Sequence, residues 1–136
     1  MTLSEDVKSA NLLLADLVGH ELVEFAMSYS LNLDFGDKWV LNIESPFAIA
    51  EGSEAFSGEP VSPDATAALI PLRLRAITSA QILQDGTLVL EMGDALLSVP
   101  PDPHYESWNV AGPDGLRLVC SPSAAYIAIW MPDERR

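Results

Sequence analysis

The side chains that most often carry catalysis are few in this sequence, and they are widely spaced. There are two histidines, His20 and His104, and one cysteine. Neither histidine has a neighbour at zinc-ligand spacing, and without a cysteine pair we do not expect a zinc site. His104 lies between Asp102 and Glu106, which could support a catalytic base, but a histidine in a surface loop is the simpler interpretation.

The single cysteine, Cys120, alternates with Leu116 and Leu118 along one apolar face. This pattern indicates a small buried hydrophobic residue rather than a nucleophile. The sequence also contains no G-x-S-x-G elbow, no P-loop and no dinucleotide fingerprint. We therefore predict no catalytic residues, no cofactor and no resident metal, and the balance is against an enzyme.

Two pairs of acidic residues flank the expected hairpin turns. Asp34 and Asp37 form the first pair, and Glu91 and Asp94 form the second. Carboxylates on oxygen-rich turns could hold a calcium or magnesium ion, but no EF-hand spacing accompanies them, and Asp is also an ordinary turn residue. We keep both pairs as candidate contacts for a partner.

The most distinctive short segment is Tyr105-Glu106-Ser107-Trp108. On a strand, Glu106 and Trp108 share a face, so a buried Trp108 would leave Glu106 at the margin of the core. Our main interpretation is structural: the Glu106 carboxylate accepts hydrogen bonds from backbone N–H groups and holds the proline-rich loop that precedes it. The alternative is a ligand or partner site built on exposed Tyr105 and Glu106.

The chain is strongly acidic. Its 136 residues include 20 Asp and Glu against 7 Lys and Arg, which gives a formal net charge of -13. Such a charge repels phosphate backbones and anionic lipid, so nucleic acid and membranes are not expected as partners, whereas basic protein surfaces are attracted. A solvated, soluble surface without a partner is the simpler explanation of the same charge.

The length and composition predict one domain over residues 1–136 with a self-sufficient core. A single cysteine excludes an internal disulfide and favours a reducing cytoplasm. The N-terminus has no basic segment followed by a long apolar one, and no apolar run approaches about 18 residues, so we expect neither a signal peptide nor a membrane span.

Local patterns predict a helix followed by strands. Residues 1–18 form an N-terminal helix or arm, because Ser4 can cap it and apolar residues recur behind it at helical spacing. In residues 23–35 every odd position is apolar, which is the period of a sheet with one buried face. One straight strand of that length would span about 43 Å, more than such a domain can hold. Because the parity is kept, we predict an odd-length turn or a bulge near Met27 to Tyr29.

Two similar hairpins follow. In LNLDFGDKWVLNI, residues 31–43, three turn residues separate Phe35 from Trp39, so that Leu33 opposes Leu41. The second segment, LVLEMGDALLSV, residues 88–99, is one residue shorter. A two-residue turn in place of the three-residue turn accounts for the difference and keeps the apolar positions on one face. The likeness suggests an internally duplicated hairpin, although any two half-buried hairpins share this pattern.

The remaining segments complete an α+β prediction. Residues 51–64 read as an acidic loop rich in Pro and Gly, and Ser62-Pro63-Asp64 starts a second short helix. The closing AAYIAIW, which ends at Trp130, is apolar on both faces, so we expect it to be central or covered. We predict a mainly antiparallel domain of about eight strands in hairpins, with one or two short helices.

The segment DPHYESWNVAGPDGLRLVCSPSAAYIAIW, residues 102–130, resembles the C-terminal half of a family of small uncharacterised actinobacterial proteins. That family shows a proline-bounded Y-E-x-W, here Tyr105, Glu106 and Trp108, and a closing strand that ends in Trp, here Trp130. With LVGHELVEF, DFGDKWVLNIESPF and DGTLVLEMGD, the likeness covers residues 17–130. It implies a fold and a lineage without an activity. Ser123-Ala124 replaces the glycine pair that the family often carries before the last strand.

Two hypotheses for function follow. The first is a non-enzymatic binding protein, and the looser resemblance of small acidic proteins to immunity proteins points to an inhibitor of a basic toxin or nuclease. Its contacts would be the acids at the hairpin tips, with Tyr105 and Glu106. The second is a small-molecule-binding or enzymatic domain with a pocket between the sheet and the Pro100–Tyr105 loop. The sequence also leaves open a symmetric homodimer through an apolar edge.

Overall fold

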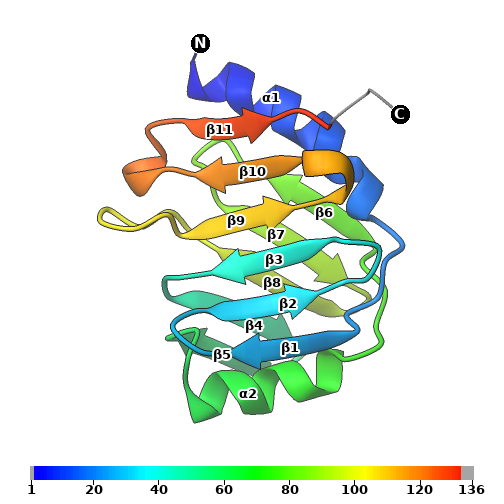
Figure 1. The fold of residues 1–136 in the computed structure, drawn as a ribbon. Helices are drawn as coiled ribbons and strands as arrows, with labels where there is room; N and C mark the ends of the chain where they lie inside the picture. Colours follow the sequence, from blue (N-terminus) through cyan, green and yellow to red (C-terminus); the bar gives the residue numbers. More distant parts are fainter. Residues whose placement is uncertain (1, 133–136) are drawn as a thin grey trace.

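The computed structural model describes residues 2–132 and shows two antiparallel β-sheets that face each other (Figure 1). The first sheet has six strands in the spatial order β1-β2-β3-β9-β10-β11, and the second has five in the order β5-β4-β8-β7-β6. The strands of the first sheet are β1 (Glu24–Met27), β2 (Leu31–Asp34), β3 (Val40–Ile43), β9 (Trp108–Ala111), β10 (Arg117–Cys120) and β11 (Ile127–Trp130). Those of the second are β5 (Glu54–Gly58), β4 (Phe47–Glu51), β8 (Ala95–Val99), β7 (Leu88–Met92) and β6 (Ser79–Ile82).

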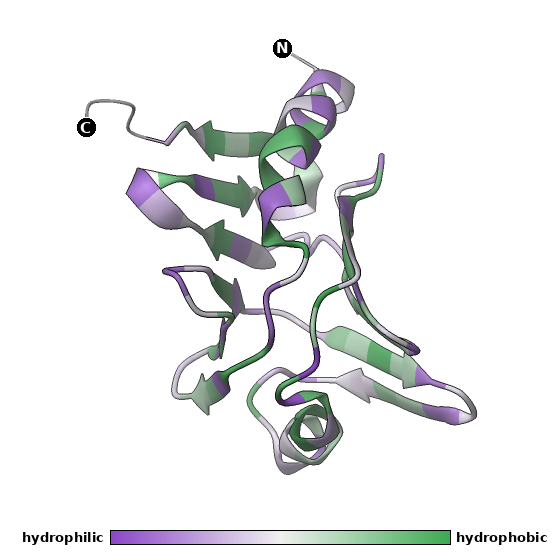
Figure 2. Cartoon of the chain, turned by 90° about the vertical axis from the view of Figure 1, so that its right-hand side faces the viewer, coloured by the Kyte–Doolittle hydropathy of each residue, from purple (hydrophilic) through white to green (hydrophobic). Residues whose placement is uncertain are grey.

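Two helices close opposite ends of the space between the sheets (Figure 2). Helix α1 (Leu3–Leu14) packs against the edge strands β11 and β6, and α2 (Pro63–Leu69) packs against β5. Thr2, rather than Ser4, caps α1 in a capping box, and Ser62 caps α2. Among residues 2–132, no helix is long and apolar enough to cross a membrane.

The core lies between the two sheets and follows the period of two that the sequence shows. In β2, Leu31 and Leu33 are fully buried, whereas Asn32 and Asp34 lie on the outward face. The largest buried side chain is Trp108, at the start of β9. Each sheet therefore covers one side of a single apolar layer and turns its other side outward.

The odd-length turn predicted within the alternating segment 23–35 is confirmed. Residues 23–35 fold back through Ser28-Tyr29-Ser30, which places Met27 opposite Leu31 and makes the turn three residues long. The pairing of Leu33 with Leu41 is also as predicted. In the second hairpin, Met92 pairs with Ala95 across a two-residue turn. The alternation of odd and even positions predicts these strand pairings correctly because one face of each strand is buried, and this burial fixes the register.

Residues 2–132 contain eleven strands, more than the eight or so predicted, because turns divide segments that the sequence pattern shows as continuous strands. The chain leaves the first sheet after β3 and enters the second at β4, with Ser45-Pro46 as the crossing. Proline lacks the N–H that a ladder needs, so a strand is interrupted there. The expected loop over 51–64 contains β5, an edge strand with little alternation in burial.

The two halves of the described chain share one topology. The first half forms a helix, then strands β1 to β5, and the second half forms a helix, then strands β6 to β10. In the first sheet β1-β2-β3 is followed by β9-β10, and in the second β6-β7-β8 is followed by β4-β5. Each half therefore places three strands in one sheet and two in the other. The two similar hairpins, β2–β3 and β7–β8, occupy equivalent positions, and only β11 has no counterpart.

Backbone hydrogen bonds show the same correspondence at the bridge where the halves meet, Glu21 with Ala76. The N–H of Gly19 donates to the carbonyl of Ile77 (2.8 Å), and the N–H of Leu74 donates to that of Leu22 (2.7 Å). The two hydrogen bonds correspond to each other in the two halves: Gly19 is equivalent to Leu74, and Leu22 is equivalent to Ile77. Both of these residues have positive φ, 97° and 68°.

We expect the Leu74→Gly variant to be more stable than the wild type. A leucine at φ 68° is in the left-handed region, which costs about 1–2 kcal/mol for a residue with a Cβ, while its side chain is 65% exposed and contributes little packing. Offset by the greater freedom of glycine in the unfolded chain, the net gain is about 0.5–1 kcal/mol. Urea unfolding measures it, and a loss of stability would show that the exposed leucine packs more than its position indicates.

Candidate functional site

The structure places the predicted contact residues at opposite ends of the strands (Figure 1). Strand β3 begins opposite Asp34, beside the first hairpin tip, and ends at Ile43, opposite Trp108. Tyr105 and Glu106 precede Trp108 and so lie beyond the far end of β3 from that tip. The hairpin tips and the pair Tyr105 and Glu106 therefore do not form one continuous site, and contact of either with a partner stays a prediction.

The two hairpin tips, in contrast, lie at the same end, on either side of the bridge between the halves. Asp37 Oδ2 lies 3.8 Å from Nδ1 of His20. At the equivalent place in the other half, Arg75 donates a hydrogen bond to Glu51 at 2.6 Å, and the field of Asp94 also acts on this guanidinium. The hydrogen bond to Glu51 is the main reason that the pKa of Arg75 is raised. At this end Glu51 thus forms an ion pair with Arg75, and Asp37 lies beside the His20 ring.

A metal site at the tips gains no support. Asp34 Oδ1 accepts a hydrogen bond from the N–H of Gly36 at 2.8 Å, the usual role of an aspartate in a turn. Among residues 2–132, no group of three or more His, Cys, Asp and Glu side chains is arranged to hold a metal ion.

The carboxylate that holds the proline-rich loop belongs to Asp102, not to Glu106. Asp102 Oδ1 accepts from the N–H groups of His104 (2.8 Å) and Tyr105 (3.1 Å), and the Asp102 carbonyl accepts from Ser123 N–H (2.7 Å). Glu106 is exposed and lies outside strand β9, so the shared strand face that predicted its role does not exist. The sequence located the pinned loop correctly and assigned the wrong carboxylate.

The three other residues singled out in this part of the chain have distinct environments. Trp108 is fully buried, and its Nε1–H donates to the Gly86 carbonyl at 2.9 Å. Cys120 is buried, and burial raises the pKa of its thiol, which fits a core residue rather than a nucleophile. Strand β11 is an edge strand and not a central one, although helix α1 packs against it, and the Trp130 side chain at its end is 53% exposed.

The turn before β11 shows a local cost of the Ser123-Ala124 pair. Both residues have positive φ, 58° and 50°, which glycine adopts without steric penalty. The glycine pair implied by the resemblance would suit this turn.

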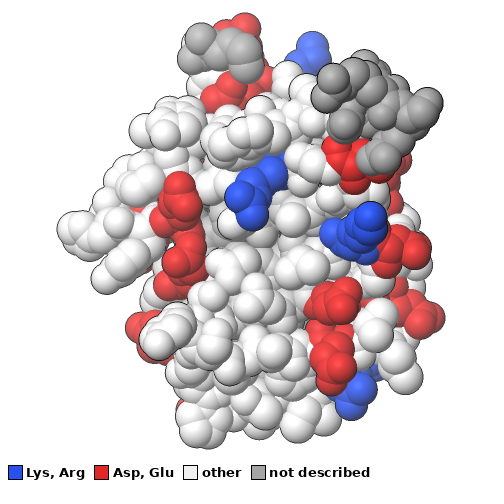
Figure 3. All heavy atoms as spheres, in the orientation of Figure 1, with Lys and Arg blue, Asp and Glu red and all other residues white. Residues whose placement is uncertain are grey.

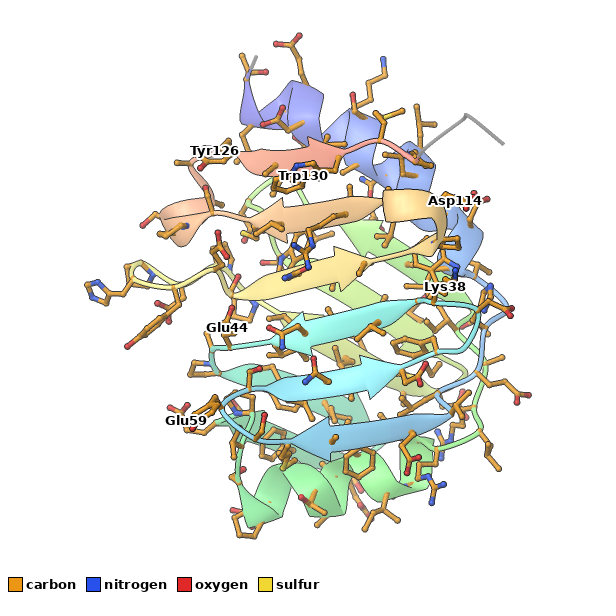
Figure 4. All side chains as sticks on the ribbon, viewed as in Figure 1. Lys38, Glu44, Glu59, Asp114, Tyr126 and Trp130 are labelled. Atoms are coloured by element: carbon orange, nitrogen blue, oxygen red, sulfur yellow. The ribbon has the colours of Figure 1, made fainter. Side chains whose placement is uncertain are left out.

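An acidic groove lies at the end of the strands where Tyr105 is found. Its volume is about 480 Å³, and four segments that are distant in sequence supply its walls. The lining residues are Tyr29, Glu44, Ser45, Pro46, Glu59, Asp102 and Tyr105. Figure 4 shows Glu44 and Glu59 at this end of the two sheets. The second hypothesis expected a pocket between the sheet and the Pro100–Tyr105 loop; this loop does supply Asp102 and Tyr105, but turns rather than strands supply the rest of the lining.

Local hydrogen bonds hold each wall of this groove. Tyr29 is at the apex of the β1–β2 turn, which closes when Ser28 N–H donates to the Ser30 carbonyl at 3.0 Å. Glu44 N–H donates to the Ser107 carbonyl at 3.0 Å, which joins the β3–β4 crossing to the segment before β9. The Glu59 carbonyl accepts from the Ser62 hydroxyl at 2.9 Å. The groove is therefore built on fixed turns rather than on free loops.

Its side chains combine negative charge with exposed aromatic rings. Glu44, Glu59 and Asp102 line it, no Lys or Arg does, and none of the three forms an ion pair with a described residue. Tyr29 is fully exposed and Tyr105 is 59% exposed. Such a groove favours cationic groups, because carboxylates attract them and tyrosine faces bind them.

One polar group in the wall lacks a partner. Ser45 is 2% exposed, and its hydroxyl makes no hydrogen bond with any described residue. Buried polar atoms are nearly always hydrogen-bonded, and leaving one unpaired costs about 1–3 kcal/mol. A ligand or an ordered water that reaches this wall would remove that cost.

Other hollows in the described surface carry less chemistry. One of about 530 Å³ is lined by His20, Trp39 and Asp37, where the Asp37 carboxylate is already close to a histidine. Another, between β4, β5 and α2, has about 120 Å³, which suits only a very small molecule. Of these hollows, the groove alone combines unmatched carboxylates, exposed tyrosines and an orphan hydroxyl, and it is the candidate site.

Sequence reasoning found Tyr105 but missed most of the groove. The residue types and spacing of Glu44, Ser45 and Pro46 gave no signal of a site, and Glu59 is one of several acids in the predicted loop over 51–64. Tyr29 stood at the bend that parity predicted. A fully exposed tyrosine at a turn apex is the signal that could have drawn attention, since an odd turn lifts its apex residue out of the sheet.

The fold defines the class of protein as a small antiparallel β-sandwich with two capping helices. The chain belongs to a family of unknown function (DUF6188), whose model matches residues 13–130. No curated protein and no solved structure matches the chain.

Proposed function

We propose that the protein is a non-enzymatic binding protein whose acidic groove takes a basic segment of a protein partner. The observation that carries this proposal is the set of three carboxylates without a cationic neighbour, Glu44, Glu59 and Asp102, flanked by Tyr29 and Tyr105. An inhibitor of immunity type, set against a basic toxin or nuclease, is the partner relationship that best fits an acidic chain of this size.

The physical argument concerns both affinity and rate. A lysine or arginine that lies over an exposed tyrosine gains about 0.5–1 kcal/mol, and more as it is desolvated. Carboxylates at the rim add a similar amount each when they pair with the same segment. The net charge of -13 steers a basic partner from long range, so association is fast at low salt.

A small molecule is the second candidate occupant. The orphan hydroxyl of Ser45 favours it, because a compact ligand that carries a hydrogen-bonding group could reach a side chain that is 2% exposed. The two candidates differ in their response to salt: steered binding of a basic peptide weakens as salt screens the charges, whereas a small neutral ligand is less sensitive.

The test uses a fluorescent nonapeptide of arginine as the probe, with anisotropy as the readout, at about 50 mM and about 300 mM salt. We expect binding to wild type that weakens with salt, a loss of about fivefold or more in affinity for Glu44→Lys, and a similar loss for Tyr105→Ala. The matched control is Glu91→Lys, which makes the same change of charge on the outward face of β7. It should weaken binding about twofold, through net charge alone.

Equal losses for Glu44→Lys and Glu91→Lys would mean that the probe responds to the overall charge or to the hairpin tips rather than to the groove, and the groove would be removed from the proposal. An unchanged affinity for Tyr105→Ala would exclude the aromatic contact. Circular dichroism of each variant confirms that the sheets are intact.

A further inference from the structure

The outward face of the six-stranded sheet is largely uncharged at its centre, in a chain with a net charge of -13 (Figure 3). Cross-strand pairing aligns its side chains in two rows that run across all six strands. The first row is Ala26, Asn32, Asn42, Asn109, Val119 and Ala128. The second row is Glu24, Asp34, Val40, Ala111, Arg117 and Trp130.

The charges of this face lie at opposite ends of the second row. Glu24 and Asp34 are directly opposed on β1 and β2, an unfavourable placement of two like charges, and neither forms an ion pair with a described residue. Arg117, on β10, likewise has no ion pair among residues 2–132. Three strand spacings, about 14 Å, separate Asp34 from Arg117, so they cannot pair within one molecule.

We propose that this face is the interface of a symmetric homodimer. A two-fold axis that runs along the strands, between β3 and β9, places β2 opposite the partner's β10. Asp34 then faces the partner's Arg117, and Arg117 faces the partner's Asp34. The same axis sets Asn42 against the partner's Asn109, and both are amides able to donate and accept.

The self-complementary pattern is specific to this sheet. On the outward face of the five-stranded sheet, the one charged side chain in the paired rows is Glu91, on β7. The equivalent axis through β8 would set Glu91 opposite Ala50 of the partner, on β4. Two copies joined there would place both Glu91 carboxylates where the paired rows supply no cation, which is costly. In the proposed dimer, by contrast, the partner's Arg117 faces Asp34 and lies one strand spacing from Glu24, which itself faces the partner's Trp130.

The size of the face predicts a weak dimer. Six strands about 4.8 Å apart and four residues long present about 400 Å² per copy, half of what a standard interface buries. We therefore expect a dissociation constant in the micromolar range. A two-fold axis along the strands does not change the position of a residue along the strand direction. The acidic grooves of both copies would therefore open at the same end of the dimer.

Sedimentation velocity over about 5–500 µM tests the proposal. We expect wild type to shift from monomer to dimer, and Arg117→Glu and Asp34→Arg each to weaken dimerisation about tenfold or more, because each sets like charges face to face. The double variant Asp34→Arg with Arg117→Glu should restore it. The matched control is Lys8→Glu on helix α1, which changes the net charge equally and should leave the dimer intact.

A monomer at all concentrations would overturn the proposal, as would a dimer that Arg117→Glu leaves unchanged. Failure of the double variant to recover, with intact circular dichroism, would show that Asp34 and Arg117 do not face each other. None of these results depends on the groove, so the proposed function is tested separately.

Discussion

Replacing Trp108 with alanine is expected to lower the free energy of unfolding by about 4–6 kcal/mol, the largest effect of any single change considered. Removing so large a buried side chain costs about 3–5 kcal/mol in lost burial and cavity formation. The Gly86 carbonyl also loses the indole N–H that donates to it at 2.9 Å. A buried acceptor left unpaired adds about 1–3 kcal/mol, in part shared with the cavity term.

The hydrogen bond is special because it joins the two sheets. Trp108 begins β9 in the first sheet, and Gly86 lies in the turn between β6 and β7 of the second. Its loss should therefore loosen both the packing of the sheets and the 101–107 segment that ends at this residue. Peptide binding to the groove should weaken together with stability.

Urea unfolding of Trp108→Ala, Trp108→Phe and Trp130→Ala separates the contributions. The phenylalanine variant retains most of the burial and should lose about 1–3 kcal/mol, mainly from the hydrogen bond. Trp130→Ala is the matched control, since this ring is 53% exposed, and it should lose under about 1 kcal/mol. If the two alanine variants were equally destabilised, the structural role assigned to Trp108 would be wrong.

The second large effect is expected at Gly86 itself, where alanine should cost about 2–4 kcal/mol. Its φ of +94° is strained for any residue with a Cβ. A Cβ there would also lie 2.6 Å from the Cβ of Ala124, closer than such atoms approach in folded proteins. Both effects act at the residue whose carbonyl accepts the hydrogen bond from Trp108. We therefore expect this small substitution to disturb the packing of Trp108 in the core.

Gly93→Ala is the matched control. Gly93 also has a positive φ, +65°, but nothing lies within 4 Å of the position that a Cβ would take. Its loss, about 1–2 kcal/mol, measures the backbone cost alone. Adding Ala124→Gly to Gly86→Ala should recover most of the difference, because it removes the clashing atom. No recovery would mean that the turn responds to backbone strain and not to contact with Ala124.

Much of the local structure could be predicted because it depends on short-range patterns. Alternation of apolar residues predicted the register of β2 with β3 and of β7 with β8, and parity predicted the odd turn at Tyr29. Asp85-Gly86 has the residue types that favour a tight turn, and Asp85 accepts a hydrogen bond from Thr87 N–H there. These features need only the chain neighbours and one buried face.

Prediction failed where a residue's role is set by segments distant in sequence. Glu106 was expected to hold the loop, but β9 starts only at Trp108, and Asp102 is the carboxylate that reaches the loop N–H groups. Trp130 was expected inside, but it pairs with Arg117 on the outward face of the six-stranded sheet and is 53% exposed. Apolar composition does not distinguish a covered face from one left for a partner.

The sequence by itself determined the class of fold, the buried face of each hairpin and the acidic character of the protein, because these follow from periodicity and charge. Only the tertiary structure decided which strands share a sheet, since that choice depends on how the two halves interleave. It also decided that Tyr29, Glu44, Glu59, Asp102 and Tyr105 meet in one groove. The physical reason is that the groove forms from turns and loops of four segments, and the position of each in space depends on the packing of both sheets around one core.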